Sequence, residues 1–199
     1  MRIAPFALLL VVLALAACGG SNKQAQQTCP TQGRSVSIPS LDPAKTYTVN
    51  VRTNLGAFAL ALDVKDSPCT SSSFASLVRK GFFDGTLFHR IVPGFVIQGG
   101  DPTGTGRGGP GYTVVDVPPR DARYTRGVVA MAKTSSEPPG TSGSQFFVVT
   151  AADSGLAPDY ALLGKVTKGL DVVERIGRLG NALGRPTRKV TVLQMTVSP

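Results

Sequence analysis

The chain has 199 residues, of which 42 % are hydrophobic and 17 % charged, so one domain with its own core is expected. Its 23 glycines and 15 prolines, with few long helical patterns, favour a β-rich fold with many turns. The net charge of +9 comes from scattered basic residues without interleaved aromatic residues, which argues against nucleic-acid binding. A solvated basic surface is preferred over attraction to anionic membrane or cell-wall polymers.

The first 17 residues have the features of a signal peptide. Met1 and Arg2 form a short positive start, and positions 3 to 17 are apolar apart from Pro5 but too short to span a membrane. The stretch ends in Leu-Ala-Ala before Cys18, which resembles the lipobox of bacterial lipoproteins. That resemblance implies cleavage before Cys18, a diacylglycerol on its sulfur, and an extracytoplasmic protein anchored to the bacterial cell membrane. An ordinary secretory signal followed by an incidental cysteine is the alternative.

Residues 18 to 43 are predicted to form a flexible tether, because the segment begins with small and polar residues that cannot bury a core. If Cys18 is lipidated, Cys29 and Cys69 are the cysteines that remain. Outside the cytoplasm these two can pair in only one way. A disulfide between them would attach the end of the tether to the domain, and two free or buried thiols are the alternative.

Residues 44 to 199 are predicted to form the folded domain. Apolar and polar residues alternate over 47–52 and again over 58–62, which predicts a hairpin. A helix capped by Thr70 or Ser71 follows and ends at Gly81. Further β-type runs lie at 112–115, 127–132, 144–150, 162–166 and 189–197, and a second short helix at 169–176. The total is about eight strands and two helices.

The stretch from Phe88 to Asp101 holds the chain's one histidine and an arginine among apolar residues. Read as a strand, it places Arg90 and Gln98 on the same face. The Pro93–Gly94 step suggests a bulge or a sheet edge, because proline cannot donate to a sheet ladder. A bulge could also turn Phe95 toward Arg90, which would place a guanidinium against an apolar floor.

Other kinds of site are poorly supported. Gly104, Gly106 and Gly109 match G-x-G-x-x-G, but Pro110 and a β-type run follow where a nucleotide site needs a helix, so a surface loop is predicted. One histidine and scattered carboxylates predict no metal site and no cofactor. His89 has no G-x-S-x-G serine to activate and is interpreted as a structural residue with satisfied hydrogen bonds.

A second candidate strand places Gln145 and Phe147 on one face. As a bare pattern, Phe147 is a core residue. What remains is a non-covalent site made of Arg90, two glutamines and several aromatic residues, and the residue pattern alone does not say what it binds.

Several separated blocks resemble the signature of the cyclophilins, which are peptidyl-prolyl cis–trans isomerases. The main block is the stretch from Phe88 to Asp101. The others are residues 83–86, 131–132, 143–147 and 163–166, in the family's order. The resemblance runs from about Tyr47 to the C-terminus. It implies a closed eight-stranded antiparallel barrel capped by two helices, with the site on the outer surface.

The resemblance also implies the residues of the site. Arg90 corresponds to the catalytic arginine, with Gln98 orienting it and Phe95 in the pocket. The substrate-binding positions are Val96, Ala132, Lys133, Thr134, Gln145, Phe147, Leu156 and Tyr160. The family usually has methionine at position 96 and Ala-Asn-Ala at 132–134. Because it uses the backbone N–H of the middle residue, Lys133 can still serve.

Two departures from the family pattern stand near the pocket. Gly155 occupies the position where many eukaryotic members have tryptophan, and Tyr160 the position where they have histidine. Tyr160 still offers an aromatic wall with a polar tip. The missing tryptophan resembles bacterial cyclophilins and affects cyclosporin affinity more than catalysis.

The resemblance thus implies an enzyme that accelerates X-Pro isomerisation in exported proteins by non-covalent stabilisation of the twisted amide. Its partners are proline-containing polypeptides and, through the lipid anchor, the membrane. The alternatives are a cyclophilin-like module or holdase that binds proline segments without significant turnover, and a structural lipoprotein. A monomer is expected, because a closed barrel has no exposed sheet edge.

Overall fold

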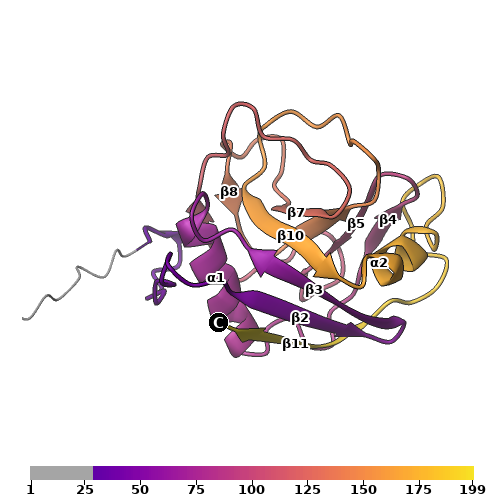
Figure 1. Ribbon diagram of the computed structural model, residues 1–199, viewed down its shortest axis with the longest axis horizontal. Coiled ribbons are helices and arrows are strands. Elements are labelled where there is room, and N and C mark those ends of the chain that lie inside the picture. The colour runs from indigo at the N-terminus through magenta and orange to yellow at the C-terminus, as the bar shows by residue number, and fades with distance from the viewer. Residues whose placement is uncertain (1–28) are drawn as a thin grey trace, which may run out of the picture.

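Eight antiparallel strands form one curled sheet in the computed structural model, which describes residues 29–199 (Figure 1). Their order across the sheet is β11–β2–β3–β10–β7–β9–β5–β4. The strands are β2 (Thr48–Thr53), β3 (Gly56–Leu62), β4 (Arg90–Val92), β5 (Val96–Gly99), β7 (Val128–Met131), β9 (Phe146–Val149), β10 (Leu162–Lys168) and β11 (Val192–Ser198). A small sheet with the order β1–β6–β8 joins β1 (Gln32–Gly33), β6 (Tyr112–Val115) and β8 (Thr141–Ser142). The mainly β architecture with two helices confirms the sequence prediction.

The β2–β3 hairpin follows from the alternation in the sequence. Val49 and Val51 are fully buried, whereas Asn50 and Arg52 between and after them are exposed. This period of two is expected when one face of a strand meets the core. Gly56 has a φ of 125°, a conformation that glycine adopts without strain, and β3 begins there directly after the turn.

The sheet is curled but not closed, so the predicted closed barrel is wrong. β11 and β4 are its edge strands, and no ladder joins them within residues 29–199. The segment before β4 meets the start of β11 through an isolated bridge, Leu87 with Thr191, and a few flanking backbone hydrogen bonds, such as that from the Phe88 N–H to the Val190 carbonyl. The edge of β4 is covered by a loop instead, because the Ile91 N–H donates to the Gly184 carbonyl at 2.9 Å. That bond satisfies a backbone group that a closing ladder would have used. The monomer, which was inferred from closure, stays a prediction.

Helix α1 (Pro68–Arg79) begins before the caps expected from the sequence. Ser67 is the N-cap residue, but its side chain forms no capping hydrogen bond. Pro68 lies in the first turn of the helix, where a missing N–H is tolerated. The Asp116 carboxylate, distant in the sequence, accepts the Thr70 N–H at 2.5 Å. An acceptor with negative charge suits a helix N-terminus. Thr70 and Ser71 were therefore wrong as caps, since the acceptor comes from a residue that local sequence cannot indicate.

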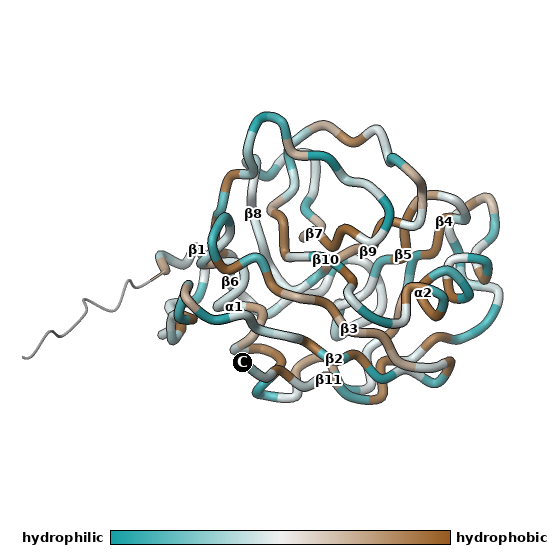
Figure 2. Tube along the Cα trace, in the orientation of Figure 1, coloured by the Kyte–Doolittle hydropathy of each residue, from teal (hydrophilic) through white to brown (hydrophobic). Residues whose placement is uncertain are grey.

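The two helices lie at opposite ends of the curled sheet (Figure 1). α1 packs against β11 and β6, and α2 (Leu170–Gly177) against β3 and β5. Phe74 of α1 stacks on Phe83 with ring centroids 4.7 Å apart and meets Phe146 of β9 edge-on at 5.5 Å. Hydrophobic segments run along the strands in Figure 2, and hydrophilic ones along many of the connecting loops. The main core thus fills the inside of the curled sheet.

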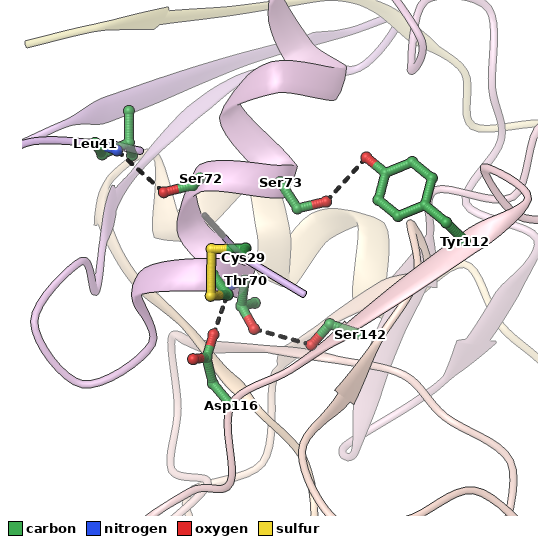
Figure 3. Close-up of a disulfide and its surroundings, with 9 residues drawn as sticks. Cys29, Leu41, Thr70, Ser72, Ser73, Tyr112, Asp116 and Ser142 are labelled. Atoms are coloured by element: carbon green, nitrogen blue, oxygen red, sulfur yellow. Dashed lines mark hydrogen bonds between the residues drawn. A yellow bond between two sulfur atoms is a disulfide. The ribbon is translucent and has the colours of Figure 1, made fainter. Parts of the chain in front are cut away.

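The segment from residue 29 to 43, here called the N-terminal arm, is bound to the domain rather than free. Cys29 and Cys69 form a disulfide that joins the arm to α1 (Figure 3). Ile38 and Leu41 are buried, and the Leu41 N–H donates to Ser72 Oγ of α1 at 3.1 Å. The sequence had placed this segment in the flexible tether, because its apolar residues are too few and too scattered to predict packing.

Within residues 29–199, no helix is long and apolar enough to cross a membrane. The predicted signal peptide and the lipidation of Cys18 lie outside the described residues, and both stay predictions.

Replacing both disulfide cysteines, Cys29→Ser with Cys69→Ser, is expected to lower the free energy of unfolding by about 2–4 kcal/mol, because the bond closes a long loop. Denaturant unfolding of the oxidised chain and of the double variant measures the difference. The wild type in reductant is the matched control and should unfold like the variant. Reactive Cys29 and Cys69 thiols in the denatured, unreduced chain would contradict the pairing.

Candidate active site

Strands β5, β9 and β7 carry apolar side chains on both faces. Successive residues of a strand point to opposite sides, so a run of apolar residues divides between two surfaces. Ile97, Val129, Phe146 and Val148 belong to the main core, whereas Val96, Ala130, Phe147 and Val149 form a second cluster with Tyr124. Phe95, Leu156 and Tyr160 pack against this second cluster and are only partly buried. The outer face of the sheet therefore has an apolar pocket that is open to solvent, here called the outer pocket.

Three aromatic rings fix the wall of the outer pocket. Tyr160 meets Phe147 and Tyr124 edge-on, with ring centroids 5.4 and 6.0 Å away. The Tyr124 hydroxyl donates to the Tyr160 carbonyl at 2.6 Å and accepts the Tyr160 N–H at 3.0 Å. Burial raises the pKa of Tyr124, so its hydroxyl keeps its proton at neutral pH. The buried Tyr124 thus holds the backbone of Tyr160 in place.

Arg90 lies at the edge of the outer pocket, at the start of a chain of side-chain hydrogen bonds. It stands opposite Gln98 in the β4–β5 ladder, and its Nη1 donates to Gln98 Oε1 at 3.3 Å. Gln98 Nε2 donates to Gln145 Oε1 at 3.0 Å, and Gln145 Nε2 to the Gly108 carbonyl at 3.0 Å. Among the described residues no carboxylate forms an ion pair with Arg90. The guanidinium is therefore oriented by an uncharged amide and is not paired with a carboxylate.

Pro93 and Gly94 form the turn of a hairpin, so the predicted bulge is wrong. The other alternative, a sheet edge, is confirmed, because Pro93 directly follows the edge strand β4. The Phe95 N–H donates to the Val92 carbonyl at 3.0 Å, and Gly94 adopts a φ of 69°. The Phe95 carbonyl accepts the Thr150 N–H at 2.8 Å, which ties the turn to the end of β9. Arg90 and Gln98 still share a face, because directly opposite residues of an antiparallel pair point to the same side.

The segment 132–134 presents one backbone N–H without a partner. The Ala132 N–H donates to the Gln145 carbonyl at 2.8 Å, and the Thr134 N–H to Glu137 Oε2 at 2.5 Å. For the Lys133 N–H between them, no acceptor exists within residues 29–199. Because backbone donors rarely go unmatched unless water or a ligand accepts from them, this N–H is available to a bound molecule.

The Lys133 side chain is held away from solvent. Its Nζ lies 2.6 Å from Asp159 Oδ2 and donates to the Glu137 carbonyl at 3.0 Å. Its side chain is only 4 % exposed, and the ammonium lies 5.6 Å from the centre of the Tyr160 ring. The long side chain therefore supports the pocket wall, while its backbone faces the site.

Comparison with known proteins decides the family. The family model described as "Cyclophilin type peptidyl-prolyl cis-trans isomerase/CLD" matches residues 48–197. The chain belongs to this family. "Peptidyl-prolyl cis-trans isomerase-like 1" of Homo sapiens is 40 % identical over 160 residues, which are 78 % of this chain and 93 % of the relative. "Peptidyl-prolyl cis-trans isomerase CYP18-2" of Arabidopsis thaliana is 38 % identical over 154 residues, 75 % of this chain and 92 % of the relative.

A solved structure is similar in fold. The cyclophilin-type peptidyl-prolyl cis–trans isomerase of Cryptosporidium parvum, crystallised in the presence of the dipeptide Ala-Pro, has a TM-score of 0.68 and 28 % identity. The match covers 76 % of this chain and 99 % of that one. These findings make the chain a cyclophilin-type peptidyl-prolyl cis–trans isomerase.

The structure gathers most of the predicted site residues of this cyclophilin. Val96, Phe147, Phe95, Leu156, Tyr160 and Ala132 line or flank the outer pocket, and Arg90, Gln98 and Gln145 form the polar chain beside it. Lys133 and Thr134 follow Ala132 at its rim. Gly155 is exposed with open space around its Cα, so no side chain replaces the family's tryptophan there. Between residues 29 and 199, no group of three or more His, Cys, Asp or Glu residues could hold a metal ion.

Sequence analysis missed the role of Asp101, whose hydrogen bonds organise the glycine-rich loop at residues 104–111. Its buried carboxylate accepts the Thr103 N–H at 2.7 Å, the Thr103 hydroxyl at 2.8 Å and the Gly106 N–H at 2.5 Å. Burial by itself raises the pKa of Asp101, but the hydrogen bonds from Thr103, Gly108 and Gly106 outweigh it and lower the pKa to about 2. The loop it holds supplies the Gly108 carbonyl that accepts from Gln145. The cue in the sequence was an aspartate that is separated only by Pro102 from a run of threonine and glycine.

His89 was expected to have satisfied hydrogen bonds, and this was wrong. Both ring nitrogens are buried without a hydrogen-bond partner among residues 29–199. Burial lowers the pKa of His89, so the ring is neutral at pH 7. The neutral ring lies beside Gly106, so its position is held by packing and not by a hydrogen bond.

Asp101→Asn is expected to lower the free energy of unfolding at pH 7 by about 2 kcal/mol, because a pKa that falls from 3.8 to about 2 on folding stabilises the ionised form. This stabilisation is complete above pH 4 and is lost as the pH falls from about 4 to 2. Denaturant unfolding of wild type and variant between pH 7 and pH 2 measures it. Asp84→Asn, at an exposed aspartate on another loop, is the control. A difference between wild type and Asp101→Asn that does not shrink at low pH would contradict the assignment.

Proposed function

We propose that the outer pocket and Arg90 are the isomerase site of this cyclophilin. The observation that carries the proposal is an unpaired guanidinium, oriented by Gln98, at the rim of an apolar pocket that also presents the free Lys133 N–H. A proline ring is apolar and has no N–H of its own, so it fits a pocket of this kind. The N–H of Lys133 matches the carbonyl of the residue before the proline.

The proposed mechanism makes and breaks no covalent bond. Rotation about an X-Pro bond must disrupt amide conjugation, with a barrier of about 18–20 kcal/mol. In the twisted state the proline nitrogen becomes pyramidal and gains a lone pair, whereas the planar amide nitrogen accepts hydrogen bonds poorly. A donor aimed at that nitrogen therefore stabilises the transition state more than either ground state, which is the requirement for catalysis.

Each part of the site has one task in this proposal. Phe147 and its apolar neighbours hold the proline ring and exclude water, which strengthens the electrostatic effect of Arg90. Gln98 fixes the guanidinium, and Gln145 fixes Gln98 through the bond of 3.0 Å between their amides. The Lys133 N–H holds the carbonyl on the other side of the rotating bond, so one end of the amide turns against the other.

We further propose that the mature protein is a bacterial lipoprotein, anchored outside the cytoplasm by a diacylglycerol on Cys18. The lipobox-like end of the apolar stretch supports this, and so does the Cys29–Cys69 disulfide, because disulfides persist in oxidising compartments. Its substrates would then be exported proteins with slowly isomerising prolines. No ATP is needed by this mechanism, which suits a site outside the cytoplasm.

Arg90→Ala is expected to lower kcat/KM by about 10²- to 10³-fold, the usual effect of losing one preorganised donor at a transition state. The measurement is the cis–trans isomerisation rate of a short Ala-Pro peptide with the full chain purified in detergent. Arg90→Lys tests geometry, since it keeps the charge but loses the planar donor group. Arg52→Ala, an exposed arginine on β2, is the matched control and should leave the rate unchanged. A loss below about threefold in Arg90→Ala would remove Arg90 from the proposed role.

Binding without turnover has its own signature in the same assay. A proline-segment module or holdase would bind the peptide, yet the wild type and Arg90→Ala would give equal rates. That result would overturn the proposed mechanism.

Cys18→Ala is expected to move the protein from the membrane fraction to the soluble fraction of the extracytoplasmic compartment, because the proposed anchor is attached to this sulfur. Mass spectrometry of the mature N-terminus of the wild type provides the direct readout. An unmodified Cys18 in the mature protein would contradict the lipoprotein form and favour an ordinary secretory signal.

A further inference from the structure

A long groove runs from the proposed isomerase site to the N-terminal arm. It encloses about 620 Å³. At one end it is lined by Gln98, Gln145 and the segment 132–134, and at the other by Gln32 and Gly33 of β1. Residues 106–111 of the glycine-rich loop line the groove between these two ends. The arm, which lies outside the family match at 48–197, therefore contributes a wall to a groove that opens on the catalytic residues.

Three sets of contacts fix the arm in this position. The disulfide to Cys69 holds its first residue against α1. β1 pairs antiparallel with β6, with Gln32 opposite Thr113. Arg34 then binds the glycine-rich loop twice, because its N–H donates to the Gly111 carbonyl and its Nη2 to the Pro110 carbonyl, each at 3.0 Å. Because the arm is already fixed in this position, a ligand that binds against it does not have to order it, and no conformational entropy of the arm is lost on binding.

The α1 end of the arm is equally well anchored. Figure 3 shows the disulfide beside polar contacts that join α1 to the N-terminal arm and to β6 and β8 of the small sheet. Ser73 Oγ lies 3.1 Å from the Tyr112 hydroxyl of β6, and Thr70 Oγ1 lies 3.0 Å from Ser142 Oγ of β8. Cys29 packs in a small apolar cluster with Ile38, Tyr112 and Val114. The arm, α1 and the small sheet thus form one unit at the far end of the groove.

The groove lies on the side of the site that receives the residues before the proline. Ala132 belongs both to the outer pocket and to the groove lining, so it marks the junction of the two. In the proposed mechanism the proline occupies the outer pocket and the Lys133 N–H binds the preceding carbonyl. The polypeptide upstream of that carbonyl then continues into the groove, toward Gln32.

We infer that the N-terminal arm is a substrate-binding element, in which Gln32 of β1 contacts the polypeptide segment that precedes the target proline. The lining combines apolar surface with polar groups, among them the Gln32 amide, the Thr113 hydroxyl and glycine backbone groups. These polar groups can bind the backbone or a polar side chain of an extended segment, while the apolar surface accommodates the rest of it. The disulfide keeps this wall in place, so recognition of the upstream segment depends on it. This inference rests on the proposed placement of the proline.

The test compares two substrates of the full chain. One is a short peptide with a single residue before Ala-Pro, and the other is the same peptide extended upstream by four serine and glutamine residues. Gln32→Ala is expected to raise KM for the extended peptide by about three- to tenfold, the effect of one lost hydrogen bond, and to leave the short peptide unaffected. The Cys29→Ser, Cys69→Ser pair is expected to act in the same way. Ser37→Ala, at an exposed position of the arm away from the groove, is the matched control.

The two substrates separate this inference from the proposed function. Loss of activity on the short peptide in Arg90→Ala tests the isomerase site alone. The ratio between the KM values of the two peptides tests the arm. Equal effects of Gln32→Ala on both peptides would reduce the arm to a structural role and overturn the inference. No effect on either peptide, or no preference of the wild type for the extended one, would overturn it as well.

Discussion

The alternation of side chains along three neighbouring strands is the constraint on which this structure depends. β5, β9 and β7 are apolar on both faces, so the same strands that close the main core with one set of side chains build a binding surface on its outside with the other set. Ile97 and Phe146 belong to the first surface, and Val96 and Phe147 to the second. The pocket therefore cannot shift in register without exposing the core, which makes it as rigid as the fold.

The architecture could be predicted where its causes are local. The β2–β3 hairpin and both helices follow from periods of two and 3.6 in the sequence. Closure could not be predicted this way, because whether β4 pairs with β11 or with the loop at Gly184 depends on contacts between distant segments. The start of α1 was missed for the same reason, since its acceptor is Asp116. The packing of residues 29–43 rests on a disulfide, on the pairing of β1 with β6, on hydrogen bonds to distant residues and on two isolated apolar side chains, none of which a local pattern indicates.

The site also contains features that the sequence predicted and features that it did not. The sequence placed Arg90 and Gln98 on one face, because they are an even number of residues apart in what was read as one strand. In the structure they lie on two strands of a hairpin, directly opposite each other, and so they still share a face. Motif resemblance supplied the pocket residues, which periodicity alone would have assigned to the core. The resemblance implied a role for the Lys133 N–H, but periodicity could not show that this N–H is free or that the Asp101 carboxylate is surrounded by donors. Each depends on which neighbours form the surrounding hydrogen bonds.

If the proposed lipid anchor is present, the disulfide also limits how far the domain can lie from the membrane. With lipid on Cys18 as proposed, a tether ending at Ala44 would allow a separation of up to about 90 Å, from the maximal extension of the chain. Because Cys29 is joined to α1, the span that remains from Cys18 is at most about 40 Å. The enzyme would thus stay within roughly one domain diameter of the lipid surface. Its local concentration there would be high, and proline segments leaving the membrane would meet it before they fold.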